Sequence, residues 1–231
     1  MKTAILIDGG FYRRRAQNML GEKTAAARAT ELQDYCRRHL SHRGGVSSDL
    51  YRIFYYDCLP MEKKLYHPLL HIQIDYAKSD LYTWMHTFID ELKKKRKFAI
   101  RLGKLAEEQA HFSLRPHVLK KLCNGSMDFG SLSAKDFMLE VDQKGVDMKI
   151  GLDIASLAYK KQVDQIVLIS GDSDFVSAAK LARREGIDFI LDPLFNPIKP
   201  DLFEHIDGLR TCDSRFNPDK HSSENTNHRS C

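Results

Sequence analysis

Aspartates follow two short apolar runs that lie far apart in the sequence. Asp8 comes directly after the run 5–7, and Asp172 and Asp174 follow the run 166–170 shortly after it ends. Apolar runs of this length are typical of buried strands in a parallel sheet. Ligands of such sheets bind just beyond the carboxyl ends of the strands, so we expect these acids to meet at one edge.

A third segment, residues 144–153 (KGVDMKIGLD), carries two more acids, Asp147 and Asp153. Apolar residues recur from Ile150 to Leu157 at helical spacing, which predicts a helix. At about 100° per residue, the two acids lie roughly 60° to either side of this apolar stripe. Both carboxylates therefore flank the face that we expect to be buried.

Carboxylates crowded at a dry sheet edge repel one another unless a cation neutralises them. Mg²⁺ and Mn²⁺ prefer carboxylate oxygen and retain waters that phosphate oxygens can displace. His67 and His71 have the i, i+4 spacing of zinc ligands, but Pro68 separates them and a third ligand is lacking. A divalent ion lowers the pKa of a bound water and stabilises a leaving oxygen, so the predicted chemistry is phosphodiester hydrolysis.

Each acid also has an ordinary structural explanation. Asp8 precedes two glycines and could be a turn former, and Asp147 could be an acid that favours a helix N-terminus. Asp172 or Asp174 could cap the following helix, and Asp153 could pair with a lysine one turn earlier. It is the joint placement of these acids that favours a site.

The bulk properties limit the class of protein. A chain of 231 residues suits one domain, which we expect over residues 1–212, followed by a disordered polar tail over 213–231. The formal net charge of +5 permits a polyanionic partner without requiring one. Five scattered cysteines without a CxxC pair suggest a reducing cytoplasm. No apolar stretch has the length of a signal peptide core or a membrane helix, so we expect no membrane association.

The elements that must position the acids alternate along the chain. The expected strands cover residues 3–7, 50–56, 98–102, 137–141, 165–169 and 187–191. The expected helices cover residues 11–19, 24–39, 80–95, 146–159 and 175–185. This alternation predicts an α/β fold with parallel pairing and right-handed crossovers, while residues 106–135 show no clear pattern.

Three motifs in order carry a family resemblance: ILIDGG (5–10), KGVDMKIGLDIASLA (144–158) and VLISGDSDF (167–175). With them, the chain from Lys2 to about Pro193 resembles the NYN domain family, PIN-like nucleases of the LabA-like branch. The resemblance implies a PIN-like three-layer α/β/α sandwich around a central parallel sheet. It also implies a metal-dependent ribonuclease, which we expect to be an endoribonuclease that uses Mg²⁺ or Mn²⁺.

The resemblance also implies roles for particular residues. The expected catalytic and metal-binding acids are Asp8, Asp147, Asp172 and Asp174, with Asp153 as a further metal ligand. The residues expected to bind substrate are Gly9, Gly10, Arg13, Arg14, Lys144, Ser170 and Ser173. Many family members carry Asn three residues after the first Asp, where this chain has Phe11.

The expected partner is RNA, either single-stranded or structured, and a homodimer is left open. The arginines at 13–15 and the basic run 93–97 could contact phosphates, although the second run is also typical of a solvated helix end. Tyr12, Tyr55 and Tyr56 could stack on unpaired bases or could simply belong to the core.

Other functions fit the sequence less well. A phosphatase of the haloacid dehalogenase type would need two acids spaced as DxD after the first strand, where Asp8 is followed by Gly9 and Gly10. The same glycines lack the GxGxxG spacing of a dinucleotide site. A module that binds RNA or protein without cutting it remains the alternative from another class.

Overall fold

The computed structural model describes residues 1–41 and 47–219, which divide into two compact units. The first unit comprises residues 1–58, 87–103 and the chain from 145 onward, and the second comprises residues 59–86 and 104–144. The single domain expected over residues 1–212 thus contains an additional unit made of two inserted stretches.

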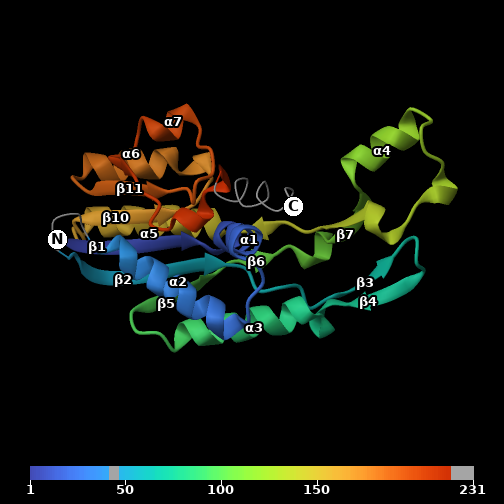
Figure 1. Cartoon of the computed structure of the whole chain (residues 1–231), viewed down its shortest axis with the longest axis horizontal. Helices are drawn as coiled ribbons and strands as arrows, with labels where there is room; N and C mark the ends of the chain where they lie inside the picture. Colours follow the sequence, from blue (N-terminus) through green and yellow to red (C-terminus); the bar gives the residue numbers. More distant parts are fainter. Residues whose placement is uncertain (42–46, 220–231) are drawn as a thin grey trace, which may run out of the picture. The chain divides into compact units, whose positions relative to one another are not determined.

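A six-stranded sheet forms the centre of the first unit (Figure 1). In sheet order its strands are β12 (Gly208–Leu209), β11 (Asp188–Asp192), β10 (Gln165–Ile169), β1 (Lys2–Asp8), β2 (Asp49–Asp57) and β5 (Phe98–Leu102). Every neighbouring pair is parallel. The chain proceeds outward through β2 and β5 on one side and through β10, β11 and β12 on the other. The order reverses between β1 and β10, where a ligand site is expected at the carboxyl edge.

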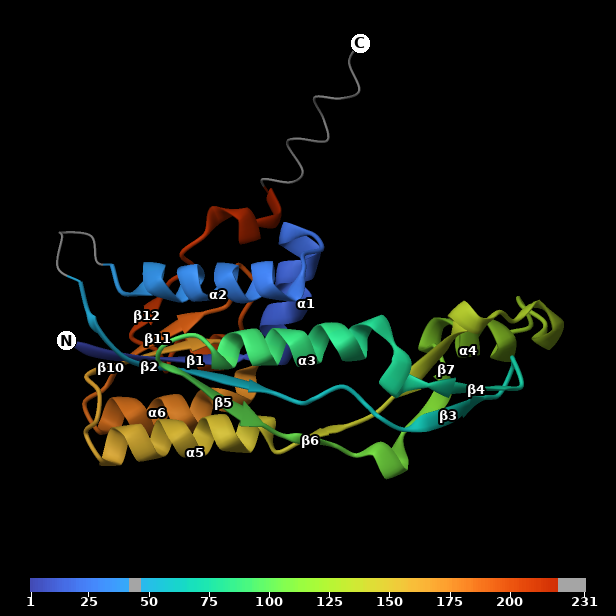
Figure 2. The same cartoon turned by 90° about the horizontal axis from the view of Figure 1, so that it is seen from below.

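Helices cover both faces of this sheet. They are α1 (Gly9–Leu20), α2 (Ala25–His39), α3 (Asp80–Lys93), α5 (Val146–Tyr159), α6 (Val176–Arg184) and the short α7 (Pro200–Phe203). Helices α1 and α2 lie on one face, and α5 and α6 lie on the other (Figures 1 and 2). This arrangement confirms the expected three-layer α/β/α fold with a central parallel sheet.

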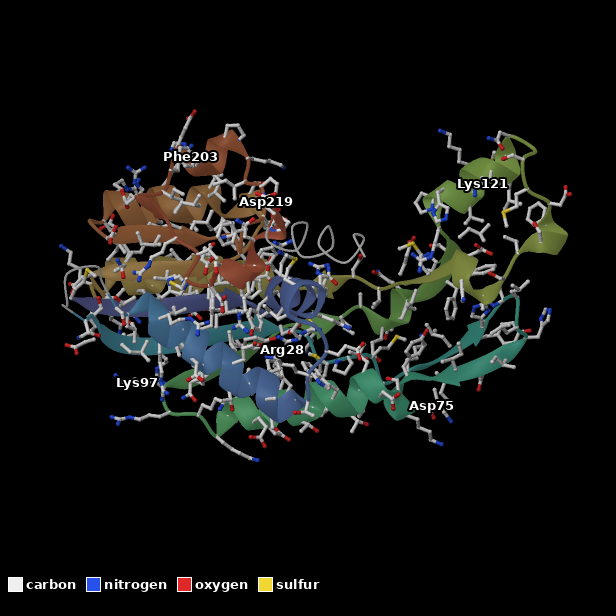
Figure 3. All side chains as sticks on the ribbon, viewed as in Figure 1. Arg28, Asp75, Lys97, Lys121, Phe203 and Asp219 are labelled. Atoms are coloured by element: carbon white, nitrogen blue, oxygen red, sulfur yellow. The ribbon has the colours of Figure 1, made fainter. Side chains whose placement is uncertain are left out.

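Side chains alternate along β2, so that neighbouring residues contact helices on opposite faces of the sheet. Tyr55 packs edge-on against Phe88 of α3, with ring centroids 5.6 Å apart. The next residue, Tyr56, points to the opposite face and donates a hydrogen bond to Asp153 of α5. All five residues of β10 are buried, as a strand covered on both faces requires. The side chains that fill these layers are drawn in Figure 3.

The second unit is built from small antiparallel pairs and a short helix. Its strands are β3 (Lys64–His67), β4 (Ile72–Asp75), β6 (Lys104–Leu105), β7 (His111–Leu114), β8 (Phe137–Glu140) and β9 (Gln143–Lys144), and its own helix is α4 (Pro116–Cys123). The strands pair as β3–β4, β6–β9 and β7–β8. His67 is buried between the rings of Phe112 and Phe137, with centroids 4.5 and 5.2 Å away. This packing, rather than metal binding, accounts for His67.

Short 3-10 turns complete the described chain. They are η1 (Tyr76–Lys78), η2 (Glu107–Gln109), η3 (Phe129–Ser131), η4 (Ala134–Asp136), η5 (Ser173–Phe175) and η6 (Ser214–Phe216). The helix expected from 175 to 185 is observed as α6 over residues 176–184, and Phe175 belongs to η5 instead. Across residues 1–41 and 47–219, no helix combines the length and the apolar character that crossing a membrane requires.

The start of the expected disordered tail differs from the prediction. Residues 214–216 form η6, and Phe216 is buried with its ring centroid 5.5 Å from that of Tyr35. Arg15 also donates a hydrogen bond to the Phe216 carbonyl. The buried Phe216 ring, this hydrogen bond and the ion pair of Asp213 with Arg38 therefore attach the stretch to the first unit. The remainder of the expected tail, residues 220–231, lies outside the described residues.

Candidate functional site

Asp8 lies where β1 ends and α1 begins. It is therefore at the carboxyl edge beside β10, where the strand order reverses. Its Oδ1 accepts a hydrogen bond from the Phe11 backbone N–H at 3.0 Å, so it caps α1. Its Oδ2 accepts one from the Ser170 hydroxyl at 3.3 Å. Ser170 directly follows β10, and this bond joins the carboxyl ends of the two central strands. The turn-former interpretation of Asp8 is thus partly right, since it caps a helix while facing the neighbouring strand.

The loop after β10 is organised by its own polar side chains. The Ser170 hydroxyl accepts a hydrogen bond from the Asp172 N–H at 3.2 Å. Asp172 in turn accepts one from the Asp174 N–H at 3.0 Å and caps η5, as the structural interpretation anticipated. Ser173 is the first residue of that turn. Ser170 therefore orients both Asp8 and Asp172.

Asp147 lies in the first turn of α5 and interacts electrostatically with the other acids at this edge. Partial burial and the charges of Asp172 and Asp174 raise the pKa of its carboxyl. Burial raises the pKa of Asp8 as well, the Phe11 N–H opposes that shift, and the charges of Asp147 and Asp57 add to it. These mutual effects require the carboxylates to lie near one another. The structure thus brings together the four acids that the sequence predicted to be catalytic.

Asp57 is an acid of this edge that the sequence analysis missed. It ends β2 and is buried, and its carboxylate accepts two hydrogen bonds from Arg13, at 2.7 and 3.0 Å. It also accepts bonds from the Tyr55 hydroxyl and the Cys58 N–H, at 2.7 and 2.8 Å. Asp57 directly follows the expected strand 50–56, so the rule that selected Asp8 would have selected it too.

Two glycines allow the backbone to approach closely at this edge. A Cβ on Gly9 would lie 2.4 Å from the Tyr55 ring and 2.6 Å from a carboxylate oxygen of Asp57. A Cβ on Gly171 would lie 2.5 Å from the Phe11 ring. Phe11, which stands at the Asn position of many family members, thus packs against the loop that carries Asp172.

The expected substrate contacts are only partly available. Arg13 is engaged by Asp57, whereas Arg14 is exposed and donates a hydrogen bond to the Gly10 carbonyl at 3.1 Å. Arg15 donates to the Leu194 carbonyl at 2.7 Å. Lys144 belongs to the second unit, where it faces Lys104 in the β6–β9 pair.

Asp153 has structural partners of its own. Its Oδ2 accepts hydrogen bonds from the Tyr56 hydroxyl at 2.7 Å and from Arg101 Nε at 3.1 Å. Asp153 therefore pairs with a residue of β5 rather than with a lysine of its own helix. Tyr12, Tyr55 and Tyr56 are all buried, which supports their interpretation as core residues.

The donors at this edge fit a hard divalent cation in their chemistry, because all of them are carboxylate or hydroxyl oxygens. Within the described part of the chain, no group of three or more His, Cys, Asp or Glu side chains is arranged so that it could hold a metal ion. Mg²⁺ commonly binds through one or two carboxylates, several waters and substrate phosphates rather than in a cage made by protein alone. The donor set is compatible with that mode of binding.

The family model described as NYN domain matches residues 74–197, which include Asp147, Asp172 and Asp174 but not Asp8. A search of curated proteins found no match. A crystal structure of a protein of unknown function from Vibrio parahaemolyticus RIMD 2210633 is similar, with 14% sequence identity and a TM-score of 0.48. The alignment covers 93% of this chain and 94% of that one.

Proposed function

Because the chain belongs to the NYN domain family, we propose that it is a metal-dependent ribonuclease that hydrolyses RNA phosphodiester bonds at the carboxyl edge of its sheet. Membership of a PIN-like nuclease family supports nuclease function in general. The Mg²⁺ or Mn²⁺ dependence, the RNA substrate, the endonucleolytic mode and a cytoplasmic location are parts of the proposal. The acids assigned to catalysis and metal binding are Asp8, Asp147, Asp172 and Asp174.

The observation that carries the proposal is the placement of these acids at the carboxyl ends of β1 and β10, which the Ser170 hydroxyl joins. Burial is the largest cause of the raised pKa of Asp147 and of Asp8; the charges of Asp172 and Asp174 add to the first shift, and the charge of Asp147 adds to the second. A fold that gathers like charges at a solvent-accessible edge gains most when a cation binds there. A cation held by these acids could in turn bind a phosphate of the substrate.

The residues of the chain have distinct tasks in this proposal. Asp8 and Asp172 would hold the cation, and Ser170 positions them through hydrogen bonds with the Asp8 carboxylate and the Asp172 backbone N–H. Asp147 and Asp174 would contribute negative charge and hydrogen-bond acceptors beside it. Arg14, which is exposed, contacts the RNA backbone. A bound divalent ion supplies a water of lowered pKa and neutralises charge on the leaving oxygen.

Asp153 is assigned a supporting role instead of direct metal binding. Its carboxylate is already engaged by Tyr56 and Arg101, which lie on β2 and β5. Such a network joins α5 to the sheet and thereby positions Asp147 at the start of the same helix. Asp153 is thus a positioning residue in this proposal.

A second candidate function is a module that binds RNA or protein without cutting. The observation in its favour is that the described residues contain no ready-made group of three metal ligands. The two hydrogen bonds of Ser170 favour the nuclease, because they hold Asp8 and the loop of Asp172 at one carboxyl edge of the sheet, where a cation would bind.

The deciding experiment is an RNA cleavage assay on the full chain with Mn²⁺ or Mg²⁺. The substrates are a linear single strand, a hairpin and a circular single strand, which only an endonuclease can open. Asp172→Asn is the test variant, because Asn keeps the capping bond to the Asp174 N–H and so preserves the turn. Asp34→Asn, at an exposed position on α2, is the matched control.

The proposal predicts cleavage by the wild-type protein and by Asp34→Asn, with loss of cleavage in Asp172→Asn and after chelation. Opening of the circular strand is expected as well. Folded wild-type protein that leaves every RNA intact with either metal contradicts the nuclease and favours the binding module. Cleavage that survives chelation contradicts the metal dependence alone.

A further inference from the structure

A groove runs beside β10, β11 and β12, with a volume of about 920 Å³. Asp188 and Ile190 line it and lie on the same face of β11 as Asp192, because side chains alternate along a strand. Asp192 is bound by Tyr35 and His39 of α2, so the groove lies on the α2 face of the sheet. Its volume is near the upper end of the roughly 300–1,000 Å³ of ligand pockets.

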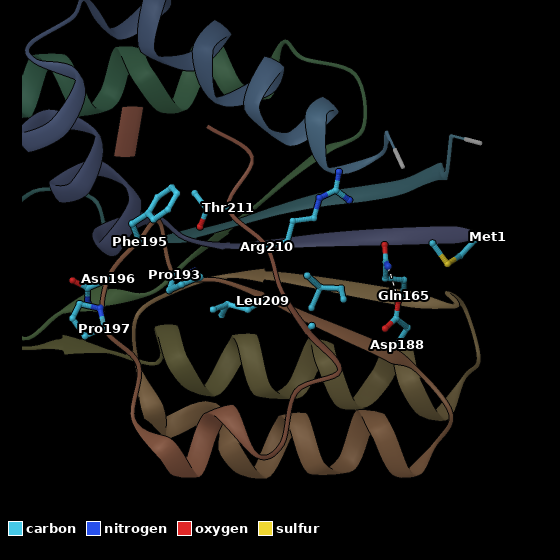
Figure 4. A pocket seen from close by; sticks show the side chains of 12 residues that line it. Met1, Gln165, Asp188, Pro193, Phe195, Asn196, Pro197, Leu209, Arg210 and Thr211 are labelled. Atoms are coloured by element: carbon cyan, nitrogen blue, oxygen red, sulfur yellow. Dashed lines mark hydrogen bonds between the residues drawn. The ribbon is translucent and has the colours of Figure 1, made fainter. Parts of the chain in front are cut away.

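The two ends of the groove differ in chemistry (Figure 4). At one end the Asp188 carboxylate accepts a hydrogen bond from Gln165 at 2.6 Å. The other end lies at the carboxyl edge of the sheet and presents the Phe195 ring and the Asn196 amide, with Pro197 beside them. The first end thus carries charged groups, with Arg210 and Met1 also lining the groove there, whereas the second end is uncharged. Flat aromatic and proline surfaces suit a planar ring.

The backbone at Phe195 is held in an unusual conformation. Leu194 and Phe195 have φ values of 49° and 59°, and consecutive left-handed residues other than glycine are costly. The surrounding structure imposes this shape, because Asp192 accepts the Leu194 N–H at 2.9 Å and Arg15 donates to the Leu194 carbonyl at 2.7 Å. The result is that the Phe195 side chain is 40% exposed beside the groove. Such imposed strain is a feature of functional sites.

Asn196 connects this end of the groove with the carboxylates. Its amide lies 3.1 Å from the position of a Cβ on Gly171. Gly171 directly precedes Asp172, so a ligand that contacts Asn196 reaches the loop that presents the acids. The Asn196 backbone N–H donates a hydrogen bond to the Pro193 carbonyl at 2.8 Å, whereas in the described ranges its side-chain amide makes no hydrogen bond to another residue and so has its donor and acceptor available for a ligand.

We propose that Phe195 and Asn196 form a nucleobase subsite in which an unpaired base of RNA stacks on the Phe195 ring and hydrogen-bonds the Asn196 amide. The inference rests on the proposed function, since the strand bound here is the strand cut at the carboxylates. It deepens that function by assigning single-stranded RNA as the substrate class next to the cut. Stacking tolerates any base, whereas the amide selects among base edges.

The test is a binding measurement that needs no cleavage. Fluorescence anisotropy of the full chain is recorded in EDTA with a labelled oligouridylate and with an abasic strand of the same length. The variants are Phe195→Leu, which removes the aromatic ring, and Phe195→Tyr, which keeps it. Phe203→Leu is the matched control, because Phe203 is an exposed phenylalanine on α7 (Figure 3) that does not line the groove.

We expect Phe195→Leu to weaken oligouridylate binding by roughly 5- to 150-fold, the range for loss of one base stack. Binding of the abasic strand stays as in the wild type, and Phe195→Tyr and Phe203→Leu bind both strands normally. An unchanged affinity of Phe195→Leu, an equal loss for both strands, or a wild-type protein that binds neither strand overturns the subsite. If the wild-type protein cuts RNA but Phe195→Leu binds the oligouridylate as tightly as the wild type does, the proposed function stands and the subsite is wrong. If Phe195→Leu loses oligouridylate binding as expected but the wild-type protein cuts no RNA, the subsite stands and the proposed function is wrong.

Discussion

Arg13 holds the Asp57 carboxylate in a two-point ion pair, with Nε 2.7 Å and Nη2 3.0 Å from its two oxygens. The Asp57 side chain has no exposed surface, so this guanidinium provides the positive charge in direct contact with a buried carboxylate. The pair joins the second turn of α1 to the end of β2. It therefore fixes the helix whose first residues follow Asp8, and the substrate contact expected of Arg13 stays a prediction.

Replacement of Arg13 by Met should destabilise the fold strongly. Removing one partner of a buried ion pair leaves an uncompensated charge, which costs about 3–5 kcal/mol. We expect the free energy of unfolding, measured by urea titration, to fall by about that amount. Arg13→Lys keeps the charge but loses the two-point geometry, so its loss should be intermediate.

Arg14→Met is the control for this measurement, because Arg14 is exposed and bonds only a carbonyl of its own helix. Its free energy of unfolding should stay within about 0.5 kcal/mol of the wild type. If Arg13→Met were as stable as the wild type and had lost RNA affinity, Arg13 would be a phosphate contact after all.

Asp147 and Asp153 should differ sharply although they lie on the same helix. Asp147→Asn should lower RNA cleavage by about 100-fold or more, since even outer partners of a metal site cost roughly 10–100-fold. It should also abolish any rise in Tm caused by Mn²⁺. Asp153→Asn should keep the Mn²⁺ effect and change cleavage by less than about tenfold, because its partly exposed pair with Arg101 contributes little. Loss of both readouts in Asp153→Asn would make Asp153 a metal ligand.

The acids of the site could be predicted from the sequence, because each lies at the end of a strand or the start of a helix with a clear apolar pattern. Asp8 follows a buried strand, and Asp147 starts an amphipathic helix whose bounds the pattern predicted correctly. The pairing of Arg13 with Asp57 was not accessible, because it depends on the distance between α1 and the end of β2. From the sequence alone, the basic run at 13–15 suggested contacts with phosphate, whereas the structure shows that Arg13 pairs with Asp57.

The second unit was the least predictable part of the fold. Its strands are two to four residues long, so they lack the long apolar runs that reveal a buried sheet, and β6–β9 and β7–β8 pair across long stretches of sequence. His67 illustrates the difficulty, since its burial depends on Phe112 and Phe137, which are more than 40 positions away in the chain. The order at residues 214–216, inside the tail expected to be disordered, has the same origin, because the contact of Phe216 with Tyr35 is set by tertiary packing.

Stability should fall between pH 6.5 and about 9 because of His39. Burial alone would lower the pKa of His39, but its contacts with Asp192 and Cys212 raise it from 6.5 to about 9. Within this window the folded chain keeps a proton that the unfolded chain has released, so the free energy of unfolding decreases as pH rises, by up to about 3 kcal/mol. His39→Gln should flatten this slope in urea titrations, whereas His111→Gln, at an exposed position, should keep it. Equal slopes in all three proteins would contradict a charged His39.

Gly171→Ala should impair cleavage without unfolding the chain. Its Cβ would lie 2.5 Å from the Phe11 ring, so the ring or the loop that carries Asp172 has to shift, and we expect the loop to move because Phe11 is anchored at the start of α1. A misplacement of about 1 Å can cost roughly 100-fold in rate, and we expect a loss of about 10- to 100-fold. Gly151→Ala in α5 is the matched control, because nothing lies within 4 Å of its added Cβ and its activity should be unchanged. The double variant with Phe11→Ala should recover cleavage, because the smaller side chain makes room. Full activity of Gly171→Ala would mean that the Phe11 contact does not position the acids.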